Sequence, residues 1–456
     1  MSIDGICPLD EHRYGSAAMR ELFSKRGRYR LYVEVEIALS LALAELGIIP
    51  ESAAQQMRAL SEEGLSLSRV EELERETRHE IAAVVKALTE RCGAAGRWVH
   101  YGATSSDILD TTMAVQFDRA LTLLLAKFDA LQATLIELAE RHLDTILIGR
   151  THGQHALPTT FGFKVANWID ELERHVGRLR DSRERICVGK MSGAVGTLAG
   201  FGARGRDIEA RVMGRLGIRA GLISTQIVHR DRAAEWACNA AMLAGTLETM
   251  ATEVRNLQRT EIAELREPFG RERQVGSSTM PHKRNPVLAE NVCSIARLLR
   301  GLLIPTLENM VHWHERDLAN SANERFTVPM TAMLLEEMLG KSQTIFSGLE
   351  VDIDRMRSNL ESSSSAFIAE AVMLALVDAG LPRLEAYERM RTLSHAKEDF
   401  RTALRREPSV AQLIEPAQLE SLLQPQAYLG AARERVTLVL EAARRRLTAS
   451  ELHRKP

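Results

Sequence analysis

The segment that decides the fold runs from residue 106 to residue 148 and reads "SDILDTTMAVQFDRALTLLLAKFDALQATLIELAERHLDTILI". It contains neither glycine nor proline, the two residues least favourable inside a helix. Large apolar side chains recur in it at alternating steps of four and three residues. This is the spacing of a helix that packs against nearly parallel helices. The apolar residues are Phe117, Leu121, Leu124, Phe128, Leu131, Leu135 and Leu138.

A helix of some forty residues is about 60 Å long and therefore needs other long helices around it. Strand-like alternation is nearly absent, and a serine-rich break at 361–367 is followed by shorter helical stretches. We therefore expect an all-α fold with an elongated central helical bundle between smaller helical domains. The expected domains are 1–105, 106–355 and 356–456. The other helices are expected at 28–46, 68–93, 160–187, 230–265, 286–314, 329–349, 368–380, 384–397 and 427–447.

The composition excludes several classes of function. Acidic and basic residues are interspersed and the net charge is only −2, so the chain lacks the basic face that nucleic-acid binding requires. It has no apolar run long enough to span a membrane, and "MSIDGICPLDEHR" at the N-terminus does not resemble a signal peptide. The five cysteines are widely spaced and never form C-x-x-C, which indicates reduced thiols. We therefore expect a cytoplasmic protein with no membrane or nucleic-acid partner.

Two weak signals do not support a cofactor or a metal. "GFGARG" at 200–205 fits the dinucleotide-binding pattern G-x-G-x-x-G, but no strand precedes it. The pairs His152/His155 and His312/His314 have no carboxylate or thiol at metal-ligand spacing. We therefore expect no cofactor and no metal.

Four polar clusters lie at or near the ends of the predicted long helices, where antiparallel neighbours bring helix ends together. They are "GATSSD" at 102–107, "GRTHGQHALPTT" at 149–160, "GSSTMPHKRNP" at 276–286 and "HERDLANSANER" at 314–325. A fifth cluster, "RHE" at 78–80, lies inside a predicted helix.

The residue types in these clusters describe a chemical task. Thr104, Ser105 and Ser106 supply hydroxyls at a helix N-terminus, which favours a bound anion. An imidazole such as that of His152 changes charge near neutral pH, as a general acid requires. Lys283 and Asn285 offer a positive charge and an amide donor to developing negative charge. Guanidinium groups suit phosphate, and Arg316, Ser321 and Arg325 are spaced to share one helical face.

"GSSTMPHKRNP" resembles the signature of the fumarase/aspartase superfamily of lyases. Within it, "GATSSDILDT", "GRTHGQHALPTTFGFK", "STQIVHRDR", "LQRTEIAEL" and "WHERDLANSANER" resemble the adenylosuccinate lyase family, from "RYGS" at 13–16 to about residue 330. The resemblance implies an all-α fold of three domains and a homotetramer whose core is a twenty-helix bundle. It also implies active sites that each draw residues from three subunits, and a succinylated purine nucleotide as the small-molecule substrate.

Carried over position by position, the resemblance also implies roles for single residues. Ser277 removes a proton from the succinyl Cβ as general base, and His152 protonates the departing nitrogen. Lys283 and Asn285 stabilise the carbanion. The matching substrate contacts are Thr104 and Ser105 for the succinyl carboxylates, Arg13, Tyr14, Arg316, Ser321 and Arg325 for phosphate and ribose, Arg78 and His79 for a neighbouring phosphate contact, and Gln226 for the substrate.

The serine base needs a physical explanation, because a serine hydroxyl is normally too weak an acid to form an alkoxide. Lys283 and the backbone N–H groups of the loop are the available stabilisers, provided that water is excluded. The residues alone leave Ser277 and Ser278 as alternatives, and the place of Ser277 in the family motif selects it.

Two departures from the family pattern keep other functions open. Glu80 stands where the family generally has Asp, and the C-terminal part follows the family only loosely. One alternative is a related C–N lyase or cycloisomerase that acts on an unphosphorylated succinyl or muconate-type substrate. The residues that match phosphate and ribose contacts argue against this alternative. They are Arg13, Tyr14, Arg316, Ser321 and Arg325. The other is a catalytically silent helical scaffold, which would turn over no succinylated amine.

Overall fold

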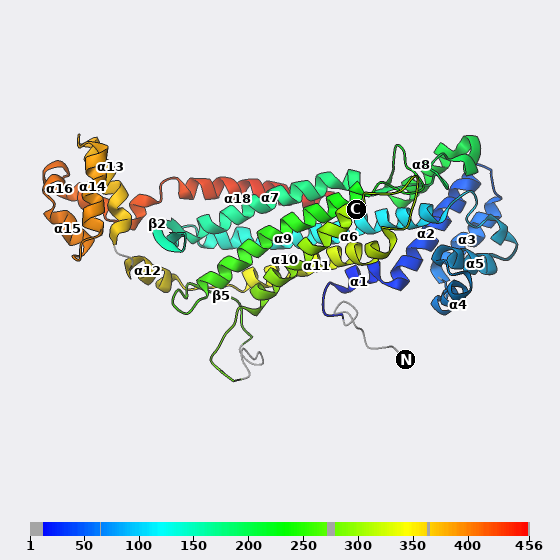
Figure 1. Cartoon of the computed structure of the whole chain (residues 1–456), viewed down its shortest axis with the longest axis horizontal. Helices are drawn as coiled ribbons and strands as arrows, with labels where there is room; N and C mark the ends of the chain where they lie inside the picture. The colour runs from blue at the N-terminus through cyan, green and yellow to red at the C-terminus, as the bar shows by residue number, and fades with distance from the viewer. Residues whose placement is uncertain (1–11, 64, 271–278, 363–364, 455–456) are drawn as a thin grey trace. The chain divides into compact units, whose positions relative to one another are not determined.

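The computed structural model describes residues 12–63, 65–270, 279–362 and 365–454. Helices predominate in these residues (Figure 1). The strands of the described residues form three sheets of two strands each. The prediction of an all-α protein is confirmed. Within the described ranges, no helix combines the length and the apolar character that a membrane crossing needs.

The described residues up to Trp98 form five α-helices and one 3-10 helix. Helix α2 packs on α3, and α4 packs on α5. Helix α5 also contacts both α2 and α3. The elements are α1 (Ala17–Phe23), α2 (Lys25–Glu45), α3 (Glu51–Glu63), α4 (Leu67–Thr77), α5 (Glu80–Cys92) and the 3-10 helix η1 (Gly93–Trp98).

Five long helices follow, and they carry the predicted apolar pattern. All seven apolar residues of the 106–148 stripe are buried, which confirms that this stripe is core. The long helices are α6 (Ser105–Arg141), α7 (Phe161–Ile186), α9 (Asp231–Leu257), α10 (Val287–Glu308) and α11 (Ser321–Ser347); the 3-10 helix η2 (Ala199–Arg204) and α8 (Gly205–Leu216) lie between α7 and α9.

The three small sheets are formed by segments that connect helices. β1 (Ile146–Thr151) and β2 (Gln154–Thr160) form an antiparallel hairpin. β3 (Val188–Gly189) pairs in parallel with β4 (Arg219–Ala220), and β5 (Leu265–Arg266) pairs antiparallel with β6 (Glu350–Val351).

The C-terminal helices pack around their own apolar core. Ile148 of β1 belongs to this core, together with Ile368, Val372, Leu376 and Leu404, so the hairpin is fastened to the C-terminal helices. The elements are α12 (Ile353–Ser362), η3 (Ser365–Ile368), α13 (Ala369–Asp378), α14 (Arg383–Ser394), α15 (Phe400–Arg406), α16 (Pro408–Leu413), α17 (Pro416–Leu422), η4 (Pro425–Tyr428) and α18 (Ala432–Arg454).

The chain divides into two compact units. Unit 1 comprises Met1–Phe128, His175–Gly245 and Ser294–Gly340, and unit 2 comprises Asp129–Arg174, Thr246–Cys293 and Lys341–Pro456. Each boundary falls inside one of the five long helices. The division of the chain at residues 105 and 355 stays a prediction.

Several predicted helix ends are wrong. The helix predicted to reach residue 148 ends at Arg141, because the β-branched and apolar residues that follow pair as the β1–β2 hairpin. The helices predicted to end at 265 and 314 end at Leu257 and Glu308. The single helix predicted over 68–93 is two helices, α4 and α5.

The break between α4 and α5 lies at the "RHE" cluster, which is therefore not inside a helix. Arg78 adopts a left-handed backbone conformation with φ of 52° and ends α4. The Nδ1 atom of His79 accepts a hydrogen bond from the Ala82 N–H at 3.2 Å and caps the start of α5. At the other end of α4, the side chain of Ser66 caps the helix by accepting a hydrogen bond from the Arg69 N–H.

Candidate active site

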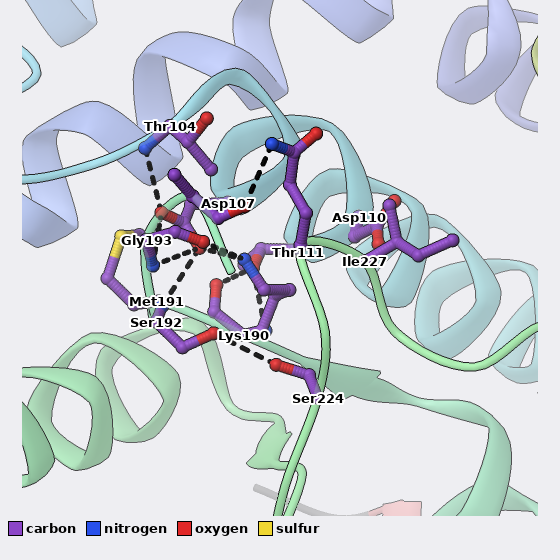
Figure 2. A network of polar contacts seen from close by, with 12 residues as sticks. Thr104, Asp107, Asp110, Thr111, Lys190, Met191, Ser192, Gly193, Ser224 and Ile227 are labelled. Atoms are coloured by element: carbon purple, nitrogen blue, oxygen red, sulfur yellow. Dashed lines mark hydrogen bonds and ion pairs between the residues drawn. The ribbon is translucent and has the colours of Figure 1, made fainter. Parts of the chain in front are cut away.

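The N-terminus of α6 is held by a buried carboxylate (Figure 2). Asp107 accepts hydrogen bonds from the N–H groups of Thr104 at 2.8 Å, Ser192 at 2.9 Å and Gly193 at 3.1 Å. Its side chain also forms an ion pair with Lys190, and both side chains are buried. The loop that follows β3 is thereby fixed against the first turn of α6, all within unit 1.

This network leaves Thr104 and Ser105 half-buried at the start of α6, while Ser106 is buried. The first two hydroxyls thus remain partly accessible to a ligand, and the third does not. The Asp107 carboxylate already occupies the positive end of the helix dipole. An anion bound by Thr104 and Ser105 would therefore depend on their hydroxyls as well as on the dipole.

A second group of charged residues surrounds a cavity of about 130 Å³ in unit 1. Three predicted substrate contacts line it together: Arg316, Ser321 and Arg325. Ser321 is the first residue of α11 and Arg325 lies in its second turn, whereas Arg316 precedes the helix. The prediction that the three share one helical face is thus wrong for Arg316, but the three converge on one cavity.

Arg316 is the guanidinium in this cavity that is best placed to bind an anion. It donates one hydrogen bond to the Asn320 side-chain oxygen at 3.3 Å. Within the described ranges no carboxylate lies within ion-pair distance of it. Burial lowers the pKa of Arg316, and the more distant carboxylates of Asp110 and Glu324 act in the opposite direction. The charge is poorly solvated, so a bound anion would stabilise it.

Arg230, in contrast, is neutralised by its neighbours. Its guanidinium binds both carboxylate oxygens of Asp110 at 2.9 and 3.0 Å and approaches Glu324 at 2.7 Å. Burial alone would lower the pKa of Arg230, but the two carboxylates raise it, so the group stays charged. The cluster of Arg230, Asp110 and Glu324 lines the cavity, and its ion pairs hold these three side chains in place.

Glu80 also lines the cavity. Its carboxylate lies 3.5 Å from Arg28 and 3.6 Å from Arg325, and it accepts a hydrogen bond from the Tyr32 hydroxyl at 3.3 Å. The residue at which this chain departs from the family pattern therefore offsets part of the positive charge of Arg325.

The other predicted contacts in unit 1 do not line this cavity. Arg13, Arg78 and His79 are exposed, and the His79 imidazole is engaged in capping α5. Tyr14 is half-buried just ahead of α1. Gln226 donates from its side-chain amide to the Ala194 carbonyl at 2.9 Å, so it supports the loop that begins at Lys190.

His152 lies in unit 2 at the tip of the β1–β2 hairpin. Thr151 pairs with Gln154, so His152 and Gly153 are the two central residues of the turn. Their φ angles of 54° and 76° are both positive, which is the conformation of a type I′ turn. The tip is exposed, and within the described ranges no hydrogen bond engages the His152 ring.

Lys283 and Asn285 precede α10, also in unit 2. Lys283 is exposed and Asn285 is half-buried. Between them, the Arg284 carbonyl accepts a hydrogen bond from the Gln258 side chain at 3.2 Å. The predicted base, Ser277, and its alternative, Ser278, lie outside the described residues.

The sequence interpretation assigned no role to Lys190, Asp107, Asp110 or Arg230, although the last three lie within the quoted motifs. One signal was available for Lys190, because it is the only charged residue between Ile186 and Ala203. A lone charge in a stretch of glycines and apolar residues requires a partner. The pairing of Asp110 with Arg230 had no local signal, since it depends on the packing of distant segments.

Family models match most of the chain. The model described as "Lyase" matches residues 12–301, and the model described as "Adenylosuccinate lyase C-terminus" matches residues 366–439. Together with the all-α fold, the first match defines the class of the protein as a lyase. The second match extends the similarity beyond residue 330, where the recognised motifs end.

The relatives specify the family more closely. The adenylosuccinate lyase of Pyrococcus horikoshii is 45% identical over 441 residues, which cover 96% of this chain and 97% of the relative. The chain belongs to the adenylosuccinate lyase family.

Solved structures with the same fold carry other names. Fumarate lyase from Mesorhizobium sp. BNC1 has a TM-score of 0.87 at 34% identity, with 94% of this chain and 98% of that chain covered. The 3-carboxy-cis,cis-muconate lactonizing enzyme from Pseudomonas putida has a TM-score of 0.87 at 33% identity, with 97% and 100% covered.

Proposed function

We propose that this protein cleaves the C–N bond of adenylosuccinate and releases fumarate and AMP. The observation that carries the proposal is the cavity in which Arg316, Ser321 and Arg325 converge, because a half-buried guanidinium without a carboxylate partner favours a phosphate. The full-length similarity to proteins named adenylosuccinate lyase supports it. The succinylated aminoimidazole carboxamide ribotide SAICAR, which carries the same phosphate and succinyl groups, is proposed as a second substrate, giving AICAR.

The proposed chemistry assigns one task to each polar group. Ser277 removes the Cβ proton, and Lys283 with Asn285 stabilises the negative charge that moves onto the adjacent carboxylate. His152 donates a proton to the leaving nitrogen. His152 lies at an exposed hairpin tip, so its ring is accessible to a ligand.

The succinyl and phosphate ends are proposed to bind to different groups. Thr104 and Ser105 hold the succinyl carboxylates, and Arg316, Ser321 and Arg325 hold the phosphate. Arg13, Tyr14, Arg78, His79 and Gln226 complete the proposed set of substrate contacts.

We further propose a cytoplasmic homotetramer with shared active sites. Five large apolar side chains on α10, on α11 and between them are 65% to 76% exposed, which supports coverage of this surface by another copy of the chain. They are Ile304, Val311, Trp313, Leu318 and Phe326.

The alternative is a cycloisomerase or a related lyase that acts on a muconate-type or unphosphorylated succinyl substrate. The similarity in fold to the muconate lactonizing enzyme favours it. The unpaired Arg316 argues against it, since a substrate without phosphate would leave a half-buried charge without a counter-ion.

The test follows fumarate release by the purified protein. Adenylosuccinate is offered first, then N-succinyl adducts that lack phosphate, and then 3-carboxy-cis,cis-muconate with its lactone followed directly. We expect turnover of adenylosuccinate. Turnover of only the phosphate-free compounds would refute the proposed function.

A further inference from the structure

Helix α2 contributes a further arginine to the cavity in unit 1. Arg28 lies in the first turn of α2 and lines the cavity together with Arg316, Ser321 and Arg325. Tyr32 follows Arg28 by four residues, which places it on the same face of the helix, and it lines the cavity as well. The sequence interpretation assigned no role to either residue of α2. All five residues belong to unit 1.

The Arg28 guanidinium has few partners. Its Nε atom is buried and has no hydrogen-bond acceptor in the described part of the chain. The ion pair of Arg28 with Glu80 is long, with 3.5 Å between a terminal nitrogen and a carboxylate oxygen, whereas a good hydrogen bond measures about 2.9 Å. A buried N–H group without an acceptor is unfavourable. The cavity therefore favours a ligand that brings an acceptor to Arg28.

The Glu80 carboxylate lies between two guanidiniums and binds neither of them closely. Its Oε1 atom is 3.5 Å from Arg28, and its Oε2 atom is 3.6 Å from Arg325. Oε1 also accepts a hydrogen bond from the Tyr32 hydroxyl at 3.3 Å. Burial and the negative charge of Glu80 raise the pKa of Tyr32, so this hydroxyl keeps its proton and remains a donor. One carboxylate is therefore shared among three groups.

The charges around the cavity leave an excess of guanidinium groups. Two of the lining carboxylates, Asp110 and Glu324, bind Arg230. Among the described residues that line the cavity, the other three arginines are left with the carboxylate of Glu80. They are Arg28, Arg316 and Arg325. A phosphate monoester carries a charge of about −1.5 to −2 at pH 7, which would balance this excess.

The size of the cavity suits one end of a ligand. Its volume is about 130 Å³, whereas pockets that enclose a whole small molecule measure roughly 300–1,000 Å³. The cavity therefore has room for a charged group such as phosphate, while the rest of a nucleotide would lie outside it.

We propose that Arg28 is a third guanidinium of the phosphate-binding site, beside Arg316 and Arg325. The proposal rests on the proposed function, in which this cavity receives the phosphate of adenylosuccinate. The Nε atom and a terminal nitrogen of Arg28 donate to phosphate oxygens, since a guanidinium fork matches two such oxygens. Because the contact with Glu80 is long, Arg28 can bind phosphate without first breaking a short ion pair.

The first test measures the kinetics of Arg28→Met and Arg28→Lys. For Arg28→Met we expect KM for adenylosuccinate to rise about tenfold while kcat changes less than about threefold. Lysine keeps the charge but loses the fork, so Arg28→Lys should raise KM by only about threefold. Arg28→Lys also carries the test if Arg28→Met does not fold. An unchanged KM in both variants would overturn the proposal.

A double variant separates direct contact with phosphate from an effect through Glu80. If Arg28 contacts phosphate, Arg28→Met still raises KM about tenfold when Glu80 is replaced by glutamine. If Arg28 serves only to hold Glu80, the effect of Arg28→Met disappears in the Glu80→Gln background. That second outcome would overturn the proposal.

The matched control is Arg30→Met on the same helix. Arg30 is 72% exposed, pairs with Glu21 at 3.3 Å and is not one of the residues that line the cavity. Its substitution should leave KM within about twofold of the wild-type value. A rise in KM equal to that of Arg28→Met would assign the effect to the loss of any arginine on α2 and would overturn the proposal.

Calorimetric binding of AMP and of adenosine gives a readout that does not depend on turnover. In Arg28→Met the Kd for AMP should rise about tenfold, while the Kd for adenosine, which lacks phosphate, should not change. Equal AMP affinity in Arg28→Met and the wild type would overturn the proposal. Failure of the wild type to release fumarate would count against the proposed function instead, and the comparison of AMP with adenosine would still decide the role of Arg28.

Discussion

Lys190 and Asp107 form an ion pair in which neither side chain reaches solvent, with exposures of 1% and 0%. Removing one member of such a pair leaves an uncompensated buried charge, which is far more costly than the loss of the attraction alone. The Asp107 carboxylate also accepts three backbone N–H groups, so its position is determined independently of the lysine.

We therefore expect Lys190→Met to lower the free energy of unfolding by about 3–5 kcal/mol. Urea denaturation followed by circular dichroism measures it. The control is Lys164→Met, which breaks a more exposed pair with Glu253 and should cost less than about 1 kcal/mol. Equal losses in the two variants would contradict the assigned role of burial.

Arg316→Met should weaken the binding of a phosphorylated substrate. A hydrogen bond to a charged group contributes about 1.5–3 kcal/mol, which corresponds to a rise in KM of about 10- to 150-fold. The kcat should fall much less, because the phosphate is remote from the bond that breaks. Steady-state kinetics of fumarate release gives both constants, with the exposed Arg357→Met as control. A KM that stays at the wild-type value would show that phosphate does not bind at Arg316.

Glu80→Gln should strengthen phosphate binding. The substitution removes the negative charge that lies 3.6 Å from Arg325 and 3.5 Å from Arg28. A pair of this kind contributes up to about 1 kcal/mol, so KM should fall about two- to fivefold. Competitive inhibition by inorganic phosphate should strengthen in parallel. If KM rises instead, Glu80 itself contacts the substrate.

His152→Ala should reduce kcat by about 10²–10⁴-fold with little change in KM, because a general acid acts in the transition state. His155→Ala is a control on the same hairpin, where His155 pairs with Arg150 across the strands. It should keep kcat within about threefold of the wild type. A change confined to KM in His152→Ala would make His152 a binding residue.

The buried cysteines should resist alkylation. Burial raises the pKa of Cys187 to about 12, and the nearby Asp118 carboxylate adds to this effect. The thiolate is the reactive form, so only about 10⁻⁴ of Cys187 is reactive at pH 8, and its alkylation rate should rise about tenfold per pH unit up to pH 10. Mass spectrometry after iodoacetamide treatment should find the partly exposed Cys238 labelled before Cys187. Preferential labelling of Cys187 would contradict this.

The thiol prediction from sequence is confirmed for the described residues, since Cys92, Cys187, Cys238 and Cys293 are all free. The long helices were likewise predictable, because a repeat such as that from Phe117 to Leu138 records burial on one face directly in the sequence. Hydrophobic spacing is a local property, and it needs no knowledge of which segments meet.

Turns and polar pairs were harder to predict. The turns contain residues that are uncommon at such positions, and the polar pair joins segments that are distant in the sequence. The His152–Gly153 turn has a local signal, since glycine suits the positive φ of a type I′ turn, but histidine is an uncommon partner in it. The break at Arg78 depends on a histidine acting as a helix cap, which the usual preferences for Ser, Thr, Asp and Asn do not anticipate. The pairing of Asp110 with Arg230 joins residues 120 positions apart and leaves no local trace.

The arginine cavity and the imidazole-bearing hairpin belong to different compact units of the chain. A mutation in unit 1 can therefore change recognition of the remote end of a substrate without altering the proposed acid, His152, in unit 2. Proteins with this fold could then differ in the remote end of their substrates while the proposed acid keeps its place. Such divergence would account for closely similar folds in proteins named for elimination and for ring closure.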